Sequence, residues 1–114
     1  MLQLNHKNLE VWKQSIALVK LTYSTTSKLP KEEQFNLTSQ MRRAAVSICA
    51  NISEGAARKS EVERKRYYEI SRSSLVELDT HFEICLSLGY ISKADIENLE
   101  QVALSVFKMI SKLS

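Results

Sequence analysis

The sequence predicts an all-α protein, a single antiparallel up-and-down four-helix bundle that spans residues 1–114. A chain of 114 residues has the size of one domain. It contains only two glycines and one proline, whereas a β-rich domain of this length normally needs more turn residues. Apolar side chains recur at steps of three or four residues in four segments joined by short links, which is typical of an antiparallel bundle.

The first two helices are predicted over residues 9–27 and 37–58. Pro30 ends the first helix, because a proline disfavours helical geometry at the residue before it. The predicted core face of the first helix consists of Leu9, Trp12, Ile16, Val19 and Tyr23. The predicted core face of the second helix consists of Leu37, Met41, Ala44, Ile48, Ile52 and Gly55.

The last two helices are predicted over residues 61–88 and 93–113. The predicted core face of the third consists of Tyr67, Ser71, Leu75, Leu78, Phe82 and Cys85. The predicted core face of the fourth consists of Ile96, Leu99, Val102 or Ala103, Val106 and Ile110.

Three positions carry signals for the ends of these helices. Ser60 and Glu63 match a capping box, in which each side chain bonds the free backbone N–H of the other residue. Gly89 is suited to a left-handed C-cap of the third helix, and Ser92 is suited to cap the fourth.

The second helix is unusually apolar, since residues 44–57 contain a single charge, that of Glu54. A surface helix normally has a polar face opposite its core face. Here that opposite face carries small or apolar residues, namely Val46, Ala50, Ser53 and Ala57. We expect this face to form an oligomer interface; the alternative is that other helices of the same bundle cover it.

Asn51 and Glu54 are polar residues within this apolar stretch. We interpret them as a structural polar network, and the alternative is that they belong to a ligand or subunit site. Glu54 and Arg58 have the i, i+4 spacing of an ion pair on one helix face.

Positive charge is concentrated in the middle of the chain. Residues 40–75 hold eight basic and four acidic side chains, whereas the remainder carries a net charge of −1. We predict a nucleic-acid-binding surface formed by Arg42, Arg43, Arg58, Lys59, Arg64, Lys65, Arg66 and Arg72. Tyr67 and Tyr68 lie beside it and are suited to stack on bases. The alternative is that Glu61, Glu63 and Glu69 neutralise these charges and that Tyr67 belongs to the core.

The residue pattern argues against an enzyme. The only histidines are His6 and His81, so the paired Glu-x-x-His motifs of metal-binding bundles are missing. Cys49 and Cys85 have no second pair for a metal site and fit the role of small core residues. No glycine-rich phosphate loop is present, and we expect no catalytic residue, metal or cofactor. No apolar run is long enough to span a membrane and no signal peptide is evident, so the expected location is the cytoplasm.

Four runs of residues carry a family resemblance. They are Leu9-Glu10-Val11-Trp12-Lys13, Gln40-Met41-Arg42-Arg43, Asn51-Ile52-x-Glu54-Gly55 and Gly89-Tyr90-Ile91, of which the second and third are specific in combination. Over nearly its whole length the chain resembles the bacterial family of proteins encoded by intervening sequences in 23S ribosomal RNA genes, also called four helix bundle proteins. This family includes the accessory variability determinant of diversity-generating retroelements.

The resemblance implies an antiparallel four-helix bundle that assembles into a ring-like homopentamer. In the retroelement branch of the family it implies a basic protein that binds nucleic acid and a reverse transcriptase. Two hypotheses follow. The first is an oligomer that binds RNA or DNA through its basic surface. The second is a protein-interaction scaffold or accessory subunit, for example of a reverse transcriptase, that does not itself bind nucleic acid.

Overall fold

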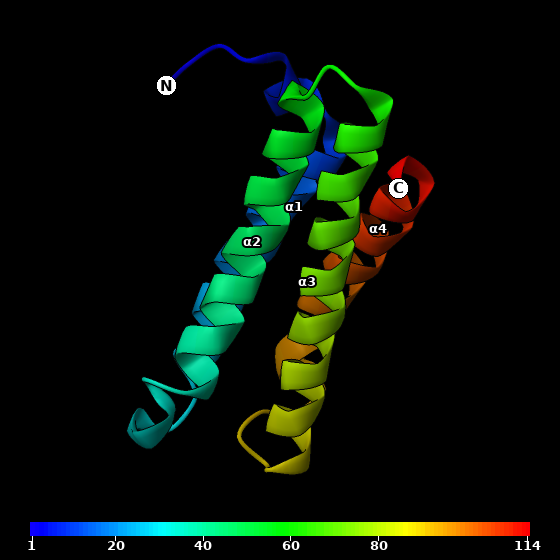
Figure 1. Ribbon diagram of the computed structural model, residues 1–114. Coiled ribbons are helices and arrows are strands. Elements are labelled where there is room, and N and C mark those ends of the chain that lie inside the picture. The colour runs from blue at the N-terminus through cyan, green and yellow to red at the C-terminus, as the bar shows by residue number, and fades with distance from the viewer.

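The computed structural model describes all of residues 1–114 and contains four long helices and no strand. The helices are α1 (Glu10–Thr26), α2 (Leu37–Ala57), α3 (Glu61–Ser87) and α4 (Glu97–Leu113). Short 3-10 turns at Asn5–Asn8, Lys31–Glu33 and Ala94–Ile96 precede α1, α2 and α4. The all-α four-helix bundle expected from the sequence is therefore confirmed (Figure 1).

The four helices occupy the corners of a square in cross-section. The packed pairs are α1–α2, α2–α3, α3–α4 and α1–α4, of which α2–α3 is the most extensive and α3–α4 the least. Figure 1 shows α2 and α3 side by side, with α1 behind α2 and α4 behind α3. The α1–α2 side and the α3–α4 side of the bundle consequently face in opposite directions.

Consecutive helices run in opposite directions, so the links between them lie alternately at the two ends of the bundle. The α2–α3 link, the start of α1 and the C-terminus lie at one end (Figure 1). The α1–α2 and α3–α4 links lie at the other end of the molecule, whose longest dimension is 44 Å.

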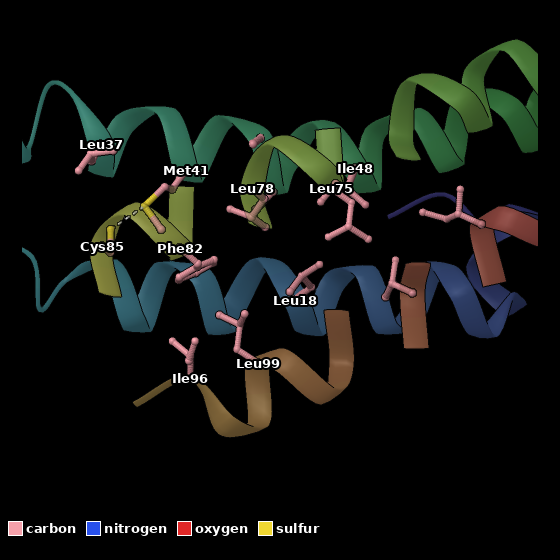
Figure 2. Packing of buried hydrophobic residues seen from close by; sticks show 14 of the residues in the cluster. Leu18, Leu37, Met41, Ile48, Leu75, Leu78, Phe82, Cys85, Ile96 and Leu99 are labelled. Atoms are coloured by element: carbon pink, nitrogen blue, oxygen red, sulfur yellow. Dashed lines mark hydrogen bonds between the residues drawn. The ribbon is translucent and has the colours of Figure 1, made fainter. Parts of the chain in front are cut away.

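The core faces predicted for α2, α3 and α4 are largely confirmed. All six predicted positions of α2 are buried, as are Ile96, Leu99, Val106 and Ile110 of α4. Figure 2 shows Met41 of α2 close to Cys85 of α3, where the two sulfur atoms are 3.7 Å apart. The apolar residues that the heptad-like spacing selects therefore do meet in one core.

The core face predicted for α1 was wrong, because the helix is rotated about its own axis and buries a different line of side chains. Leu9 and Tyr23 are exposed, whereas the buried line runs through Val11, Ser15, Leu18, Thr22 and Thr26. Two of the hydroxyl residues bond carbonyls of their own helix, since Ser15 Oγ donates to Trp12 O and Thr26 Oγ1 to Thr22 O, both at 2.7 Å, whereas the buried Thr22 hydroxyl has no hydrogen-bond partner. Since α1 packs on both α2 and α4, its most buried line lies between the two contacts.

The aromatic residue of α3 that enters the core is Tyr68, not Tyr67 as predicted. The Tyr68 ring packs on the bare backbone of Gly55, where a Cβ atom would lie 2.6 Å from Tyr68 Cε1. Gly55 therefore allows α2 and the first turns of α3 to approach closely enough to bury this ring.

The ends of the helices follow the predicted signals with two changes. Ser60 Oγ accepts a hydrogen bond from the Glu63 N–H at 3.0 Å and so caps α3, but the Glu63 side chain does not bond the Ser60 N–H, so only half of the predicted capping box forms. Gly89 has a φ of +75° and completes a Schellman motif, since Gly89 N–H donates to Leu86 O and Tyr90 N–H to Cys85 O. Ser92 caps the 3-10 turn at Ala94–Ile96, so that α4 begins at Glu97 rather than at residue 93. No helix is long and apolar enough to cross a membrane.

Candidate nucleic-acid interface

The eight basic residues predicted to bind nucleic acid do not form one surface. Arg42 and Arg43 precede Arg58 by fifteen or more residues of continuous helix, which separates them by about 22 Å along α2. Arg72 lies about 12 Å along α3 from Arg64. The structure therefore brings together only Arg58, Lys59, Arg64, Lys65 and Arg66, at the α2–α3 link.

Arg42 and Arg72 are engaged in contacts within the fold. Arg42 Nε donates to Thr26 Oγ1 at 3.0 Å and Nη2 donates to Tyr23 O at 3.3 Å, so its guanidinium binds the carboxyl end of α1. The same guanidinium lies 4.6 Å from the centre of the Tyr23 ring. Arg72 joins α3 to α4, with a hydrogen bond to Ser111 Oγ and a cation–π contact with Phe107. Both arginines serve the packing of helices.

At the α2–α3 link, three of the five basic residues also have partners in the chain. Arg64 donates to Arg58 O and to Lys59 O, at 3.2 and 2.6 Å, and thereby holds the link. Arg58 pairs with Glu54 at 3.1 Å, as the spacing predicted, and Lys65 pairs with Glu61 at 3.4 Å. Both ion pairs are exposed to solvent, so Glu54 holds Arg58 and Glu61 holds Lys65 only weakly.

Tyr67 and Tyr68 do not offer free faces for base stacking. The Arg58 guanidinium lies 4.9 Å from the centre of the Tyr67 ring and donates to its hydroxyl. Tyr67, followed by Glu54, raises the pKa of Arg58 above its usual value, so this arginine stays charged. Tyr68 is buried, and burial raises the pKa of its hydroxyl. What remains at this site is positive charge.

Three of the predicted residues are exposed and have no partner of any kind within the chain. They are Arg43, Lys59 and Arg66. Arg43 lies on α2, far from the link, while Lys59 and Arg66 lie at it.

Other helices bring further basic residues to the same end of the bundle, and none of these was among the predicted site residues. Lys7 and Lys13 lie at the start of the chain, and Lys108 and Lys112 lie near the end of α4, all at the end that holds the α2–α3 link (Figure 1). We call the segments 5–13, 54–66 and 108–114 together the basic end. They contain nine basic and four acidic side chains, a net charge of +5, so the rest of the chain carries −2. No signal in the sequence joins these segments except the antiparallel order of the helices.

The face of α2 that was expected to form an oligomer interface is only partly open. Val46, Ala50 and Ala57 are exposed. Ser53 is half-buried, because its hydroxyl accepts a hydrogen bond from the indole N–H of Trp12 at 3.0 Å. This part of the face is thus covered by α1 of the same subunit.

The polar network predicted for Asn51 and Glu54 has different members. Asn51 Nδ2 donates to Ser47 O and Ser47 Oγ, and Ser47 Oγ is 2.9 Å from Ser74 Oγ of α3. Glu54 takes no part in this network, because its side chain points to solvent and pairs with Arg58. The network therefore links α2 to α3 through amide and hydroxyl groups only.

The groups with acid–base or nucleophilic potential do not converge. His81 and Cys85 are one turn apart on α3, and His81 Nε2 lies 3.6 Å from Glu77 Oε1. Burial raises the pKa of both cysteine thiols, which disfavours the reactive thiolate. No three His, Cys, Asp or Glu side chains come close enough together to hold a metal ion.

An apolar groove with a volume of about 460 Å³ lies between α3 and α4. Nine of its twelve lining residues are hydrophobic, and its acidic members are Asp79, Glu83 and Glu100. We call it the α3–α4 groove. Its walls include Phe82 and Leu99, which lie next to one another in Figure 2.

The chain is similar to known proteins both in sequence and in fold. The family model described as 23S rRNA-intervening sequence protein matches residues 7–112. A crystal structure of a protein of unknown function from the S23 ribosomal protein family of Bacteroides thetaiotaomicron is similar with a TM-score of 0.82. The two chains are 19% identical over 90% of this chain and 96% of the other, a likeness that concerns the fold. No curated protein matches the chain.

Proposed function

Since this chain belongs to the 23S rRNA-intervening sequence protein family, we propose that it is a non-enzymatic homo-oligomeric protein that binds RNA or DNA through its basic end. The observation that carries the proposal is the net charge of +5 at the basic end, against −2 for the rest of the chain. A field of this kind attracts and orients a phosphate backbone, which releases counterions when it binds.

The form of the site determines how it would recognise nucleic acid. Lys59, Arg66 and Lys112 are exposed and have no partner in the chain, so they are available to phosphates. The tyrosine rings beside them are covered or buried, so stacking on bases contributes little. Binding is therefore expected to depend on salt and to tolerate different sequences. We propose that the protein acts in the cytoplasm, as expected from the sequence.

Self-association strengthens such a site because it repeats the charge. The homopentamer implied by the family resemblance would carry about +15 on one particle, where each chain carries +3. Exposed apolar side chains support self-association, since Phe35, Val76 and Leu104 all lie at the surface.

Fluorescence anisotropy with a labelled single-stranded RNA tests the proposal. The affinity should fall steeply between about 50 and 200 mM salt. The variant Lys59→Ala/Lys112→Ala removes two cations that are distant in sequence and share the basic end. We expect it to lower the slope of log affinity against log salt by about 0.7 per lysine.

The matched control is Lys31→Ala/Lys93→Ala, which removes two exposed cations from the opposite end of the bundle. It should leave affinity and slope nearly unchanged. Absence of binding at low salt, or equal losses in both variants, would contradict the proposal.

The α3–α4 groove supports a second candidate, a protein-interaction scaffold or accessory subunit, for example of a reverse transcriptase. An exposed apolar surface with polar residues at its rim is one mark of a protein-interaction site. Binding of a purified reverse transcriptase that withstands nuclease and is lost in Leu104→Lys would favour this candidate over nucleic-acid binding.

A further inference from the structure

We propose that the α3–α4 groove receives the α1–α2 edge of a second copy of this chain, with Phe35 as the apolar anchor and Arg43 facing the acidic rim. The inference deepens the self-association proposed above and rests on it. It names the two surfaces that meet, and of the α2 face expected from the sequence they include only Val46.

The groove is apolar and incompletely filled by its own subunit. Val76 and Leu104 are 50% and 54% exposed, although they line the groove between two packed helices. The α3–α4 pair has the least extensive contact of the four neighbouring helix pairs, and the half-buried Phe107 lines the groove between them. Water at such a surface is displaced favourably by an apolar side chain.

The rim of the groove is acidic and uncompensated. Asp79 and Glu83 on α3, and Glu100 on α4, border it from both sides. None of the three forms an ion pair within the chain. An occupant that combines an apolar anchor with a positive charge would therefore fit the groove best.

The chain itself carries such a combination on the opposite side of the bundle. Phe35, in the link before α2, is 90% exposed and contributes nothing to the core of its own subunit. It lines a shallow hollow with Tyr23, Val46 and Arg43, and Arg43 has no partner in the chain. We call these four residues the Phe35 edge.

The placement of the two surfaces dictates the kind of contact. The Phe35 edge lies on the α1–α2 side and the groove on the α3–α4 side, which face in opposite directions (Figure 1). A chain cannot fill its own groove with its own Phe35, and a two-fold dimer cannot satisfy both surfaces of both copies at once. The contact is therefore head-to-tail, and repeating it produces an assembly larger than a dimer.

Sedimentation velocity on the full chain and on single variants tests the inference. Phe35→Ser should weaken association at least about tenfold, as the loss of an aromatic anchor does, and Leu104→Lys should do the same from the other side. Arg43→Glu should also weaken association, and Glu100→Arg in the same chain should restore part of it. Val62→Ser, at an apolar residue that is 80% exposed elsewhere, is the matched control and should change nothing.

Mixing two variants gives the sharpest result. Phe35→Ser retains an intact groove and Leu104→Lys retains an intact Phe35 edge, so an equimolar mixture should form one-to-one dimers and grow no further. Circular dichroism of each variant, both at exposed positions, verifies that the fold is kept.

The outcomes separate this inference from the proposal on which it rests. A monomeric wild-type chain would overturn both this inference and the proposed self-association. A wild-type oligomer that Phe35→Ser and Leu104→Lys leave intact would overturn only the assignment of surfaces. An oligomer lost in both variants but not formed by their mixture would overturn the head-to-tail contact.

Discussion

At the scale of single residues, contacts decide what each side chain does. The basic residues of the middle segment look alike in sequence, yet Arg42 donates to a carbonyl and a hydroxyl of α1 and Arg72 to a hydroxyl of α4, whereas Arg43 has no partner. An arginine has a long, flexible side chain with five N–H donors, so its partner depends on what lies within reach in the folded chain. Spacing along the chain identified one such partner, Glu54 for Arg58, because that pair lies within one helix.

Gly55 provides a test of close packing. We expect Gly55→Ala to destabilise the fold by about 1 kcal/mol. Overpacking costs about 1–3 kcal/mol, and the helix propensity of alanine returns about 1 kcal/mol. The new Cβ would lie 2.6 and 2.9 Å from two atoms of the buried Tyr68 ring. Urea denaturation measures the change. In a Tyr68→Ala background the same substitution should stabilise the fold, and a stabilising effect in the wild-type background would refute the packing argument.

At the scale of helices, the ends were more predictable than the faces. Gly89 and Ser60 were identified as caps because the conformations they allow are properties of single residues. The buried face of α1 was not identified, because Ser15, Thr22 and Thr26 on it are polar. A hydroxyl that bonds its own helix becomes compatible with the core, and hydrophobic periodicity cannot detect this.

The end of α3 provides a second test. Gly89 has a φ of +75°, and an added Cβ atom would meet nothing within 4 Å, so the cost of a substitution lies in the backbone alone. We expect Gly89→Ala to lower the free energy of unfolding by about 1 kcal/mol, and Gly89→Asn to lower it less. Thermal unfolding followed by circular dichroism compares the two. Equal stability of Gly89→Ala and wild type would contradict the assigned cap.

The contact between the end of α1 and the start of α4 provides a test that depends on pH. Asp95 accepts a hydrogen bond from the Ser92 backbone N–H and pairs with Lys28 at 2.9 Å. The backbone N–H, followed by Lys28 and the Ser92 hydroxyl, lowers the pKa of Asp95 from 3.8 to about 2. Because the folded-state pKa is depressed, the stabilisation is present above about pH 4 and is lost as the pH falls towards 2.

Asp95→Asn should therefore melt at a lower temperature than wild type at pH 7. The difference should shrink between about pH 4 and pH 2. Glu69→Gln, at an exposed carboxylate without an ion pair and outside the α3–α4 groove, is the control for the removal of an acidic charge. A difference in melting temperature for Asp95→Asn that stays constant down to pH 2 would show that this carboxylate does not couple folding to protons.

At the scale of the whole molecule, the arrangement of helices creates surfaces that no segment possesses alone. The basic end combines cations from the start and the end of the chain with those of the α2–α3 link. The α3–α4 groove forms between two helices, and along each helix the residues that line it alternate with core residues. The net charge of +3 for the entire chain is the sum of +5 at the basic end and −2 over the rest of the chain. The two proposed binding surfaces are thus properties of the folded bundle and not of any one helix.

Self-association should couple assembly to thermal stability. If copies associate in the folded state only, mass action stabilises the folded chain as its concentration rises. We expect the melting temperature to rise by roughly 2–5 °C for each tenfold increase in protein concentration. Differential scanning calorimetry at several concentrations measures this. Phe35→Ser should show a smaller dependence, while Val62→Ser should behave like the wild type.

The sequence by itself determined the fold class, the four helices to within a few residues, the caps at Ser60 and Gly89, and the core faces of α2 and α4, because these follow from local periodicity and single-residue conformations. Only the tertiary structure decided which face of α1 is buried, that Tyr68 rather than Tyr67 enters the core, and which arginines remain unpaired. It also decided that Lys7, Lys59 and Lys112 share one end of the molecule. These features depend on distances between segments far apart in the chain, which periodicity within a helix does not encode.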